Sequence, residues 1–224
     1  MCNDLTEQEW RSLARDVHTR MANYVQPYLA SISKTNDNIN GQAHGSSVYL
    51  ELREEIGLLS CDHVVSNAAA TGYRIGHLLK RGDYYQAFKN PWITGPFPVD
   101  LTLTIIDSGV WSQGDRIALS PAQISKTHDV AAGELLMLCG YPGGPSYFSR
   151  FSGTPTLYSP TIPYTARETD LPSDFDAKAH FALKYEMELS ESVDGSTNRL
   201  PEPGGFSGSP IWDSGFVADV PLIK

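Results

Sequence analysis

Three segments carry side chains that together could perform acyl transfer. His63 follows an apolar stretch, Asp100 opens an alternating one, and Ser207 lies in the glycine-rich segment 204–212. A serine hydroxyl is a weak nucleophile, so it needs a neutral imidazole to take its proton and a carboxylate to fix that imidazole's tautomer. Each segment alone is typical of an ordinary strand end or a tight loop. Together they indicate a nucleophilic serine site.

The order of the three residues along the chain narrows the class of site. In α/β-hydrolases the histidine comes after the serine, whereas the last histidine here is His180. Ser209 also stands where a nucleophile elbow has its final glycine. A lipase or esterase of that type is therefore disfavoured. The histidines show no HExxH or related spacing, so a metal hydrolase is disfavoured too, and we expect no cofactor and no metal.

The elements that must position these residues are mainly β-strands. Short alternating or apolar runs, separated by Gly/Pro-rich turns, favour an antiparallel barrel or sandwich. The predicted strands cover residues 48–53, 57–65, 100–107, 134–140, 179–189, 209–212 and 216–223. Within residues 68–88 the apolar spacing indicates a short helix instead. A strand over 57–65 would deliver His63 near its end.

A longer helix is predicted at the N-terminus. Thr6 and Glu9 have capping-box spacing, and apolar residues recur at helical intervals as far as Tyr28. Pro27 should end the helix near Gln26. The polar stretch 31–45 is typical of a linker. We therefore expect a helix and linker over residues 1–44, whose apolar stripe packs on the main domain or on a regulatory partner.

Composition excludes several classes of protein. The chain has 17 basic and 26 acidic residues, a net charge of −9, which argues against nucleic acid or an anionic membrane as a partner. A hydrophobic content of 41% with 19% charged residues is typical of a globular protein. No apolar run reaches the roughly 20 residues of a membrane helix. The first residues lack the pattern of a secretory signal, so we expect a cytoplasmic protein or one whose leader was removed.

The three cysteines, Cys2, Cys61 and Cys139, have no CxxC spacing. A disulfide scaffold or a cysteine-rich zinc site is therefore disfavoured. We expect buried or idle thiols in a reducing compartment.

The segments resemble the motifs of the trypsin-like (chymotrypsin-fold) serine proteases, in particular the intracellular type without disulfides. Residues 58–65 are similar to the family's histidine motif, 99–101 to its aspartate motif and 205–210 to its serine motif. Residues 133–142 resemble the strand and turn that open the family's second barrel. The likeness spans roughly residues 45–220.

This resemblance implies two antiparallel β-barrels within a protease domain over residues 45–224. Barrel one would cover roughly 45–125, and barrel two roughly 126–224, with a short C-terminal part. It implies a catalytic triad of His63, Asp100 and Ser207, and an oxyanion hole made by the backbone N–H groups of Gly205 and Ser207. The expected activity is that of a serine endopeptidase acting on a protein or peptide substrate. The alternative is a catalytically weak or inactive peptide-binding or regulatory module on the same fold.

Two departures from the family pattern matter for the site. Phe206 stands where secreted members carry an aspartate that pairs with a newly cut N-terminus, so activation by propeptide cleavage is not expected. Asp62, next to His63, could compete with Asp100 as the partner of the imidazole. Adjacent residues in a strand point to opposite faces, so we expect Asp62 to point away from the site.

The resemblance also yields a prediction about specificity. The family's primary pocket is lined by the residues six to four before the serine, here 201–203, and by the strand after a hairpin, here expected at 213–215. Glu202 and Asp219 are therefore candidate substrate-binding residues that would favour a basic P1 residue. The alternative is a small or apolar P1 residue, with both acids exposed to solvent, and a digest of a peptide library separates the two. Cleavage after Ala or Leu alone would contradict an acidic pocket.

Overall fold

The computed structural model describes most of the chain. The described residues are 6–35, 41–79, 85–129, 134–144, 147–149, 156–158, 162–166, 168–185, 187–188 and 200–217. The helices are α1 (Glu7–Val25), η1 (Gln26–Tyr28), α2 (Asp62–Ala70), α3 (Ser108–Trp111) and η2 (Pro121–Gln123). No helix in these ranges is long and apolar enough to cross a lipid bilayer.

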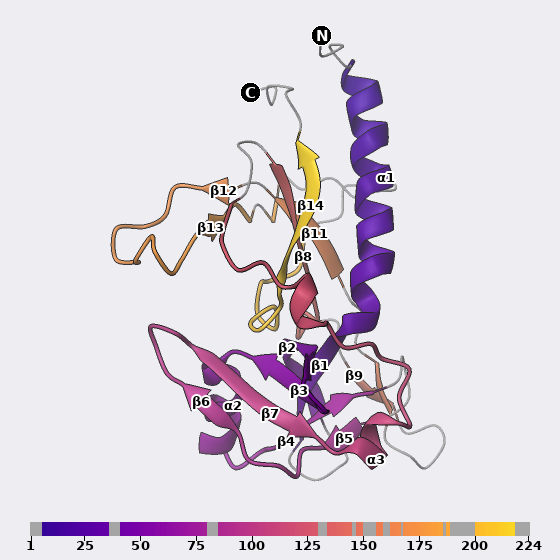
Figure 1. Cartoon of the computed structure of the whole chain (residues 1–224), viewed down its shortest axis with the longest axis vertical. Helices are drawn as coiled ribbons and strands as arrows, with labels where there is room; N and C mark the ends of the chain where they lie inside the picture. The colour runs from indigo at the N-terminus through magenta and orange to yellow at the C-terminus, as the bar shows by residue number, and fades with distance from the viewer. Residues whose placement is uncertain are drawn as a thin grey trace.

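A curled, antiparallel sheet of seven strands forms the larger part of the molecule, a half-barrel below α1 in Figure 1. Its strands, in spatial order, are β5 (Tyr85–Ala87), β4 (Arg74–Leu78), β1 (Leu29–Thr35), β2 (Gly41–Leu52), β3 (Glu55–Ser60), β7 (Leu101–Ile106) and β6 (Ile93–Gly95). The expectation of a mainly β, antiparallel fold is thus confirmed.

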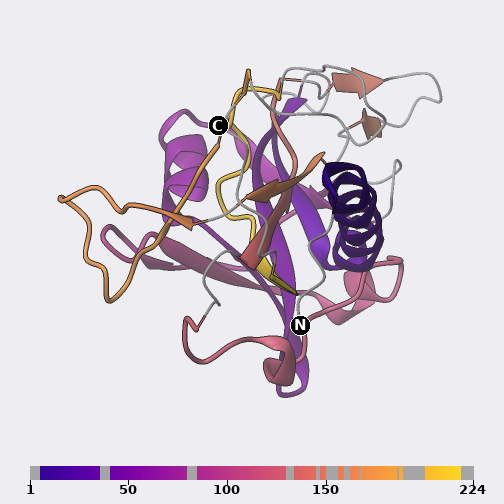
Figure 2. The same ribbon diagram turned by 90° about the horizontal axis from the view of Figure 1, so that it is seen from above.

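A smaller sheet of three strands stands above the first, beside α1 (Figures 1 and 2). Its order is β11 (Ile162–Ala166), β8 (Glu134–Gly140) and β14 (Ile211–Val217). Two further pairs of short strands are β9 (Tyr147–Ser149) with β10 (Thr156–Tyr158), and β12 (Glu168–Thr169) with β13 (Ala182–Leu183). Within the described ranges this region does not close into a second barrel.

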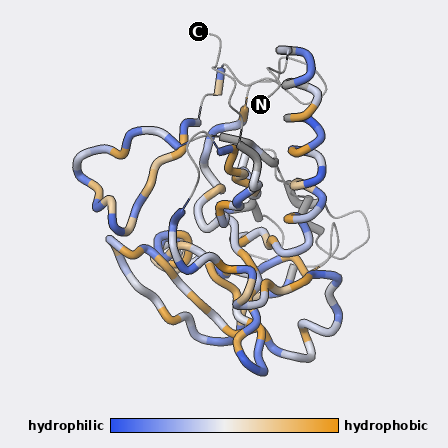
Figure 3. The backbone as a smooth tube through the Cα atoms, turned by 45° about the horizontal axis from the view of Figure 1, so that its top comes forward, coloured by the Kyte–Doolittle hydropathy of each residue, from blue (hydrophilic) through white to orange (hydrophobic). Residues whose placement is uncertain are grey.

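The N-terminal helix begins and ends where its sequence predicts. The Thr6 hydroxyl accepts the N–H of Glu9, and the Glu9 carboxylate accepts the N–H of Thr6, so the capping box is complete. Hydrophobic and hydrophilic residues alternate along the turns of this helix (Figure 3). Near its end, Met21 and Val25 pack against Met137, Cys139 and other residues of the smaller sheet. Helix α1 therefore covers that sheet, as expected for its apolar stripe.

Of residues 31–45, expected to be a linker, 31–35 and 41–45 are strand, and 36–40 lie outside the described residues. Strand β1 and the start of β2 lie at the centre of the larger sheet and pair with each other over seven positions. Ser31, Ser33 and Thr35 are fully buried, and the two serine hydroxyls lie 3.2 Å apart. The polar composition was misleading because small hydroxyl side chains can be buried when they are hydrogen-bonded.

Residues 57–88 also differ from the prediction. Strand β3 ends at Ser60, and His63 lies in the first turn of α2, not at a strand end. The short helix expected within 68–88 is wrong: α2 ends at Ala70, and β4 and β5 follow. Val64 and Val65 of α2 are buried against the curled sheet, where each side chain contributes roughly 1.5–3 kcal/mol. Packing of these two valines, not strand pairing, orients the segment that carries His63.

The C-terminal strands also depart from expectation. Strand β14 runs through the predicted hairpin at 213–215, with a register shift between Asp213 and Val217. Gly215 has a φ of +64° there, and its N–H bonds to the Asp213 carboxylate, so the turn residues form a bulge. Of the strand predicted over 179–189, the described residues contain only β13.

A buried histidine makes the stability of the larger sheet depend on pH. The His77 ring is 1% exposed, and its Nδ1 lies 2.7 Å from the Tyr49 hydroxyl. Burial, aided by the charge of Arg116, lowers the pKa of His77 from 6.5 to about 3. Since the unfolded chain binds this proton more readily, stability should be lost as the pH falls, by up to about 1.4 kcal/mol per unit between roughly 6.5 and 3.

Urea unfolding at a series of pH values measures this effect. In His77→Gln, which keeps an acceptor for the Tyr49 hydroxyl but does not titrate, the free energy of unfolding should depend less steeply on pH in the same range. Equal slopes for the two proteins would show that His77 does not control the acid sensitivity.

Candidate functional site

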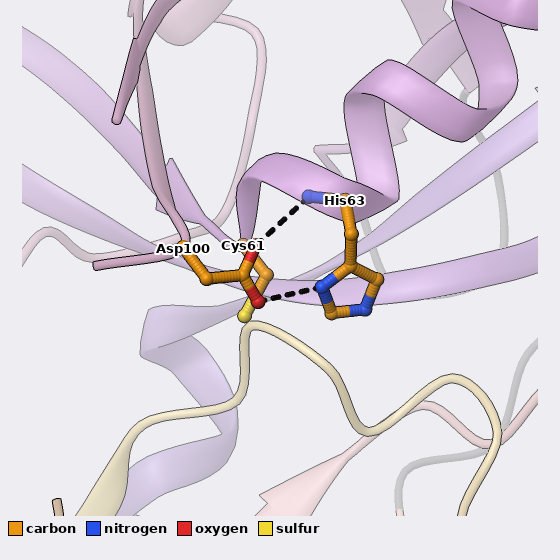
Figure 4. A group of neighbouring side chains, drawn as sticks. All are labelled: Cys61, His63 and Asp100. Carbon is orange, nitrogen blue, oxygen red and sulfur yellow. Dashed lines mark hydrogen bonds and ion pairs between the residues drawn. The ribbon is translucent and has the colours of Figure 1, made fainter. Parts of the chain in front are cut away.

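His63 and Asp100 form a hydrogen-bonded pair (Figure 4). The imidazole Nδ1 lies 2.6 Å from Oδ2 of Asp100, and the backbone N–H of His63 donates to Oδ1 at 3.0 Å. An ionised carboxylate only accepts hydrogen bonds, so the proton of the neutral imidazole belongs on Nδ1. The lone pair on Nε2 is then available to accept a proton from another group.

The N-terminal end of α2 fixes the place of this pair. The first N–H groups of a helix have no partner within it, and Cys61 at the N-cap makes no capping bond with its side chain. Asp100 supplies the missing acceptors: its carboxylate takes the N–H of His63, and its carbonyl oxygen takes the N–H of Asp62 at 3.2 Å. Asp100 has a φ of 47°, a left-handed conformation that Asp adopts more readily than most residues. Capping of α2 thus brings the acid beside the imidazole.

The environment of Asp100 favours its ionised form. Burial raises the pKa of this carboxyl, but hydrogen bonds from the backbone and ring of His63, the charge of His63 and the Cys61 thiol together hold the pKa below its ordinary value. The positive end of the α2 dipole acts in the same direction. Asp100 therefore carries its charge at neutral pH and can stabilise an imidazolium at His63.

The thiol of Cys61 connects Asp100 to the segment that contains Ser207. Its sulfur lies within 4.8 Å of a carboxylate oxygen of Asp100, and the nearby backbone N–H of Gly208 acts to lower its pKa. Burial, with the Asp100 charge adding to it, raises the pKa of Cys61 to about 11. Cys61 is thus a protonated donor at neutral pH, not the idle thiol that the sequence led us to expect. Cys139 is a buried thiol as expected, and Cys2 lies outside the described residues.

Two consecutive turns shape the serine segment. The N–H of Phe206 bonds to the carbonyl of Pro203 at 3.1 Å, and the N–H of Ser209 bonds to the carbonyl of Phe206 at 2.8 Å. The third residue of each turn is a glycine with positive φ: +100° at Gly205 and +87° at Gly208. These are features of type II turns, which need glycine at that position. The two turns therefore explain why glycines stand at positions 205 and 208, on either side of Ser207.

The serine segment lies directly on the larger sheet. A Cβ on Gly208 would come within 2.1 Å of the Ser46 carbonyl oxygen and 2.3 Å of the Ser60 hydroxyl, with the Cys61 nitrogen at 3.1 Å. The N–H of Ser46 donates to the carbonyl of Ser207 at 2.8 Å. Figure 4 shows this segment, in pale yellow, passing beside Cys61 and the His63–Asp100 pair. Gly208 thus lies at the N-terminal end of α2, and Ser207 precedes it in the chain. Among the described residues, the His63 side chain bonds to Asp100 and not to the Ser207 hydroxyl.

The turns leave backbone donors without partners. Among the residues that the structure describes, no acceptor bonds the N–H of Gly205 or of Ser207. Gly205 is buried and Ser207 is half-buried, and their N–H groups are donors of the kind that can bind an oxyanion. The Phe206 ring between them is buried and contacts the Tyr185 ring edge-on. Packing of this ring holds the two donors in place.

Of the other residues considered for the site, Asp62 and Glu202 are described by the structure. Asp62 accepts a hydrogen bond from Ser66, one turn along α2, and does not contact the His63 ring. Our expectation for Asp62 is confirmed, although the cause is helical and not strand alternation. Glu202 is exposed to solvent, and Asp219 lies outside the described residues. Sequence reasoning missed the roles of Cys61 and Ser46. The position of Cys61 two residues before His63 was a signal for Cys61, whereas no sequence pattern marked Ser46.

Comparisons with known proteins identify no family. No family model matches the sequence, and no curated protein is similar to it. Among solved structures, the chain is similar to one described as "Aromatic interactions drive the coupled folding and binding of the intrinsically disordered Sesbania mosaic virus VPg protein". The identity is 11% and the TM-score 0.41, over 84% of this chain and 75% of that chain. A likeness this distant carries no argument about fold or function.

The turn geometry predicts different effects at two neighbouring glycines. A Cβ on Gly205 would lie 2.5 Å from the Tyr141 carbonyl oxygen and 2.6 Å from the Gly143 nitrogen, whereas a Cβ on Gly204 would meet nothing within 4 Å. Gly205→Ala should lower the free energy of unfolding by at least about 1–2 kcal/mol, because of its left-handed backbone. Gly204→Ala, the matched control, should change it by less than about 0.5 kcal/mol. Equal losses in urea unfolding would contradict this geometry.

Proposed function

We propose that the protein is a serine endopeptidase in which Ser207 is the nucleophile, His63 the base and Asp100 the acid that orients it. The observation that carries the proposal is the 2.6 Å bond between His63 Nδ1 and Asp100 Oδ2, which leaves Nε2 as a base. The unpartnered N–H groups of Gly205 and Ser207 support it. The lowered pKa of Asp100 supports it as well, because this acid must stay charged beside an imidazolium.

The proposed mechanism follows from these contacts. Ser207 Oγ attacks the carbonyl carbon of a peptide bond while Nε2 of His63 takes the hydroxyl proton. The N–H groups of Gly205 and Ser207 bind the oxyanion of the tetrahedral intermediate. His63 then gives its proton to the leaving amine, and an acyl-enzyme remains on Ser207. Water, activated in turn by His63, releases the acid product and regenerates the serine. Asp100 keeps its charge throughout.

The proposed substrate is a protein or peptide in an extended conformation. The alternative is a peptide-binding module that cleaves poorly or not at all. An active protease should react with a serine-directed probe, whereas such a module should not. A fluorophosphonate probe therefore separates the two functions.

The fluorophosphonate should modify Ser207 alone, as located by peptide mass spectrometry. Ser207→Ala should abolish labelling and leave the free energy of unfolding nearly unchanged, since a hydroxyl is lost from a partly exposed turn. Asp100→Asn should cut turnover of a peptide substrate by about 10⁴-fold, because the imidazole is then held in the wrong tautomer.

Asp62→Asn is the matched control for Asp100→Asn. Asp62 lies next to His63 in sequence but bonds to Ser66, so its variant should retain turnover within a fewfold of the wild type. A mild Asp100→Asn with a crippling Asp62→Asn would show that the acid is wrongly assigned. If the folded wild-type protein fails to label at any pH, the binding-module alternative replaces the protease.

A further inference from the structure

We propose that Cys61, His63 and Asp100 form a binding site for a thiophilic divalent cation of the zinc class, and that the bound ion switches off the serine chemistry. The effect on chemistry rests on the proposed function, whereas the binding of the ion does not. Within the described part of the chain, Cys61, His63 and Asp100 form the one group of three neighbouring His, Cys, Asp or Glu side chains. Their ligand atoms, one from each residue, all lie within 4.8 Å of one another.

The types of ligand favour zinc over calcium or magnesium. A thiolate, an imidazole nitrogen and a carboxylate oxygen are all common zinc ligands, whereas the two hard cations take oxygen ligands. Three protein ligands leave a fourth tetrahedral position for water. Metal–ligand bonds of about 2.0–2.3 Å place tetrahedral ligand atoms roughly 3.3–3.8 Å apart. The 2.6 Å pair of Nδ1 and Oδ2 must therefore open by about 0.7 Å or more, which small side-chain rotations allow.

Two of the three ligands have a second contact, and the helix fixes the third. The backbone N–H of Gly208 favours the thiolate form of Cys61. The backbone N–H of His63 holds Oδ1 of Asp100, which leaves Oδ2 directed at the ring. Such outer contacts orient metal ligands and raise affinity. Cys61 and His63 are also fixed relative to each other by the first turn of α2.

Charge and access are both compatible with a dication. A Cys61 thiolate and an Asp100 carboxylate carry two negative charges, which balance the ion when the imidazole is neutral. The His63 side chain is 47% exposed and that of Asp100 is 30% exposed. An ion can therefore reach the ligands from solvent without opening the core.

Metal binding would remove the base through the tautomer of His63. A neutral imidazole has one N–H: without the ion it is on Nδ1, where it donates to Asp100, and Nε2 holds the lone pair. When Nδ1 binds the ion, that proton moves to Nε2, and Nε2 can no longer accept the proton of Ser207. The Cys61 thiol loses its proton to solvent when the metal–sulfur bond forms. When the imidazole is neutral, binding of one ion therefore releases one proton to solvent.

Cobalt titration tests the binding without reference to activity. Co²⁺ added to the wild-type protein should produce the near-ultraviolet charge-transfer band of a cobalt–thiolate bond. Cys61→Ser keeps a hydroxyl for Asp100 and Gly208 but should lose the band and bind Co²⁺ at least about tenfold more weakly. Cys2→Ser, the matched thiol control, and Ser207→Ala should both keep the band. Absence of the band in the wild type, or its persistence in Cys61→Ser, would overturn the proposed site.

Calorimetry and labelling test the consequences. Zn²⁺ titrations in buffers of different ionisation enthalpy should show about one proton released per ion in the wild type and none in Cys61→Ser. Zn²⁺ at a concentration that saturates the wild type should slow its phosphonate labelling by at least tenfold, and the same concentration should slow labelling of Cys61→Ser far less. Binding without such slowing would refute the switch. If metal-free protein does not label while the cobalt band appears, the protease proposal fails and the metal site stands.

Discussion

One buried serine connects the parts of the molecule on which the site depends. The Ser46 hydroxyl donates to the carbonyl of Gly205 at 2.7 Å and accepts the N–H of Tyr141 at 2.8 Å. Its backbone N–H and carbonyl bond to Ser207 and to the Ser60 hydroxyl. Four segments from β2, β3, the end of β8 and the serine turns therefore converge on a single residue with no exposed surface. Since an unpaired buried polar group costs about 1–3 kcal/mol, loss of any one of these segments would leave Ser46 with an unfavourable buried group.

A second connection, between the two sheets, is made by aromatic rings. Tyr28, in the turn after α1, packs with Val48 of the larger sheet and with Trp212 of the smaller one. The Tyr28 and Trp212 ring centroids lie 5.7 Å apart, and Tyr24 contacts both rings. Helix α1 thus does more than cover an apolar face. By holding β14 against the curled sheet, it fixes the strand that follows the serine turns, so the N-terminal region takes part in placing a C-terminal residue.

The sequence was informative where local chemistry decides the structure. The capping box at Thr6 and the apolar run 134–140 predicted their elements to within a residue or two, because each depends on neighbours in the chain. The pairing of His63 with Asp100 was also foreseen, from residue type and order. Prediction from the sequence failed where contacts between distant residues decide the structure. The hydroxyl-rich β1 is a strand because β4 and β2 pair with it on either side. Likewise, His63 lies on a helix because valines packed on the sheet and a cap from Asp100 stabilise that turn.

The order of the elements along the chain has a consequence for biosynthesis. All seven strands of the larger sheet lie within residues 29–106, as do His63 and Asp100, whereas the bond from Ser46 to Gly205 joins residues 159 positions apart. Domains form from the N-terminal side as the chain is synthesised, and contacts between distant residues form slowly. A nascent chain that has emerged only as far as β7 holds the His63–Asp100 pair but not Ser207. The complete proposed site can therefore assemble only after the serine turns have left the ribosome.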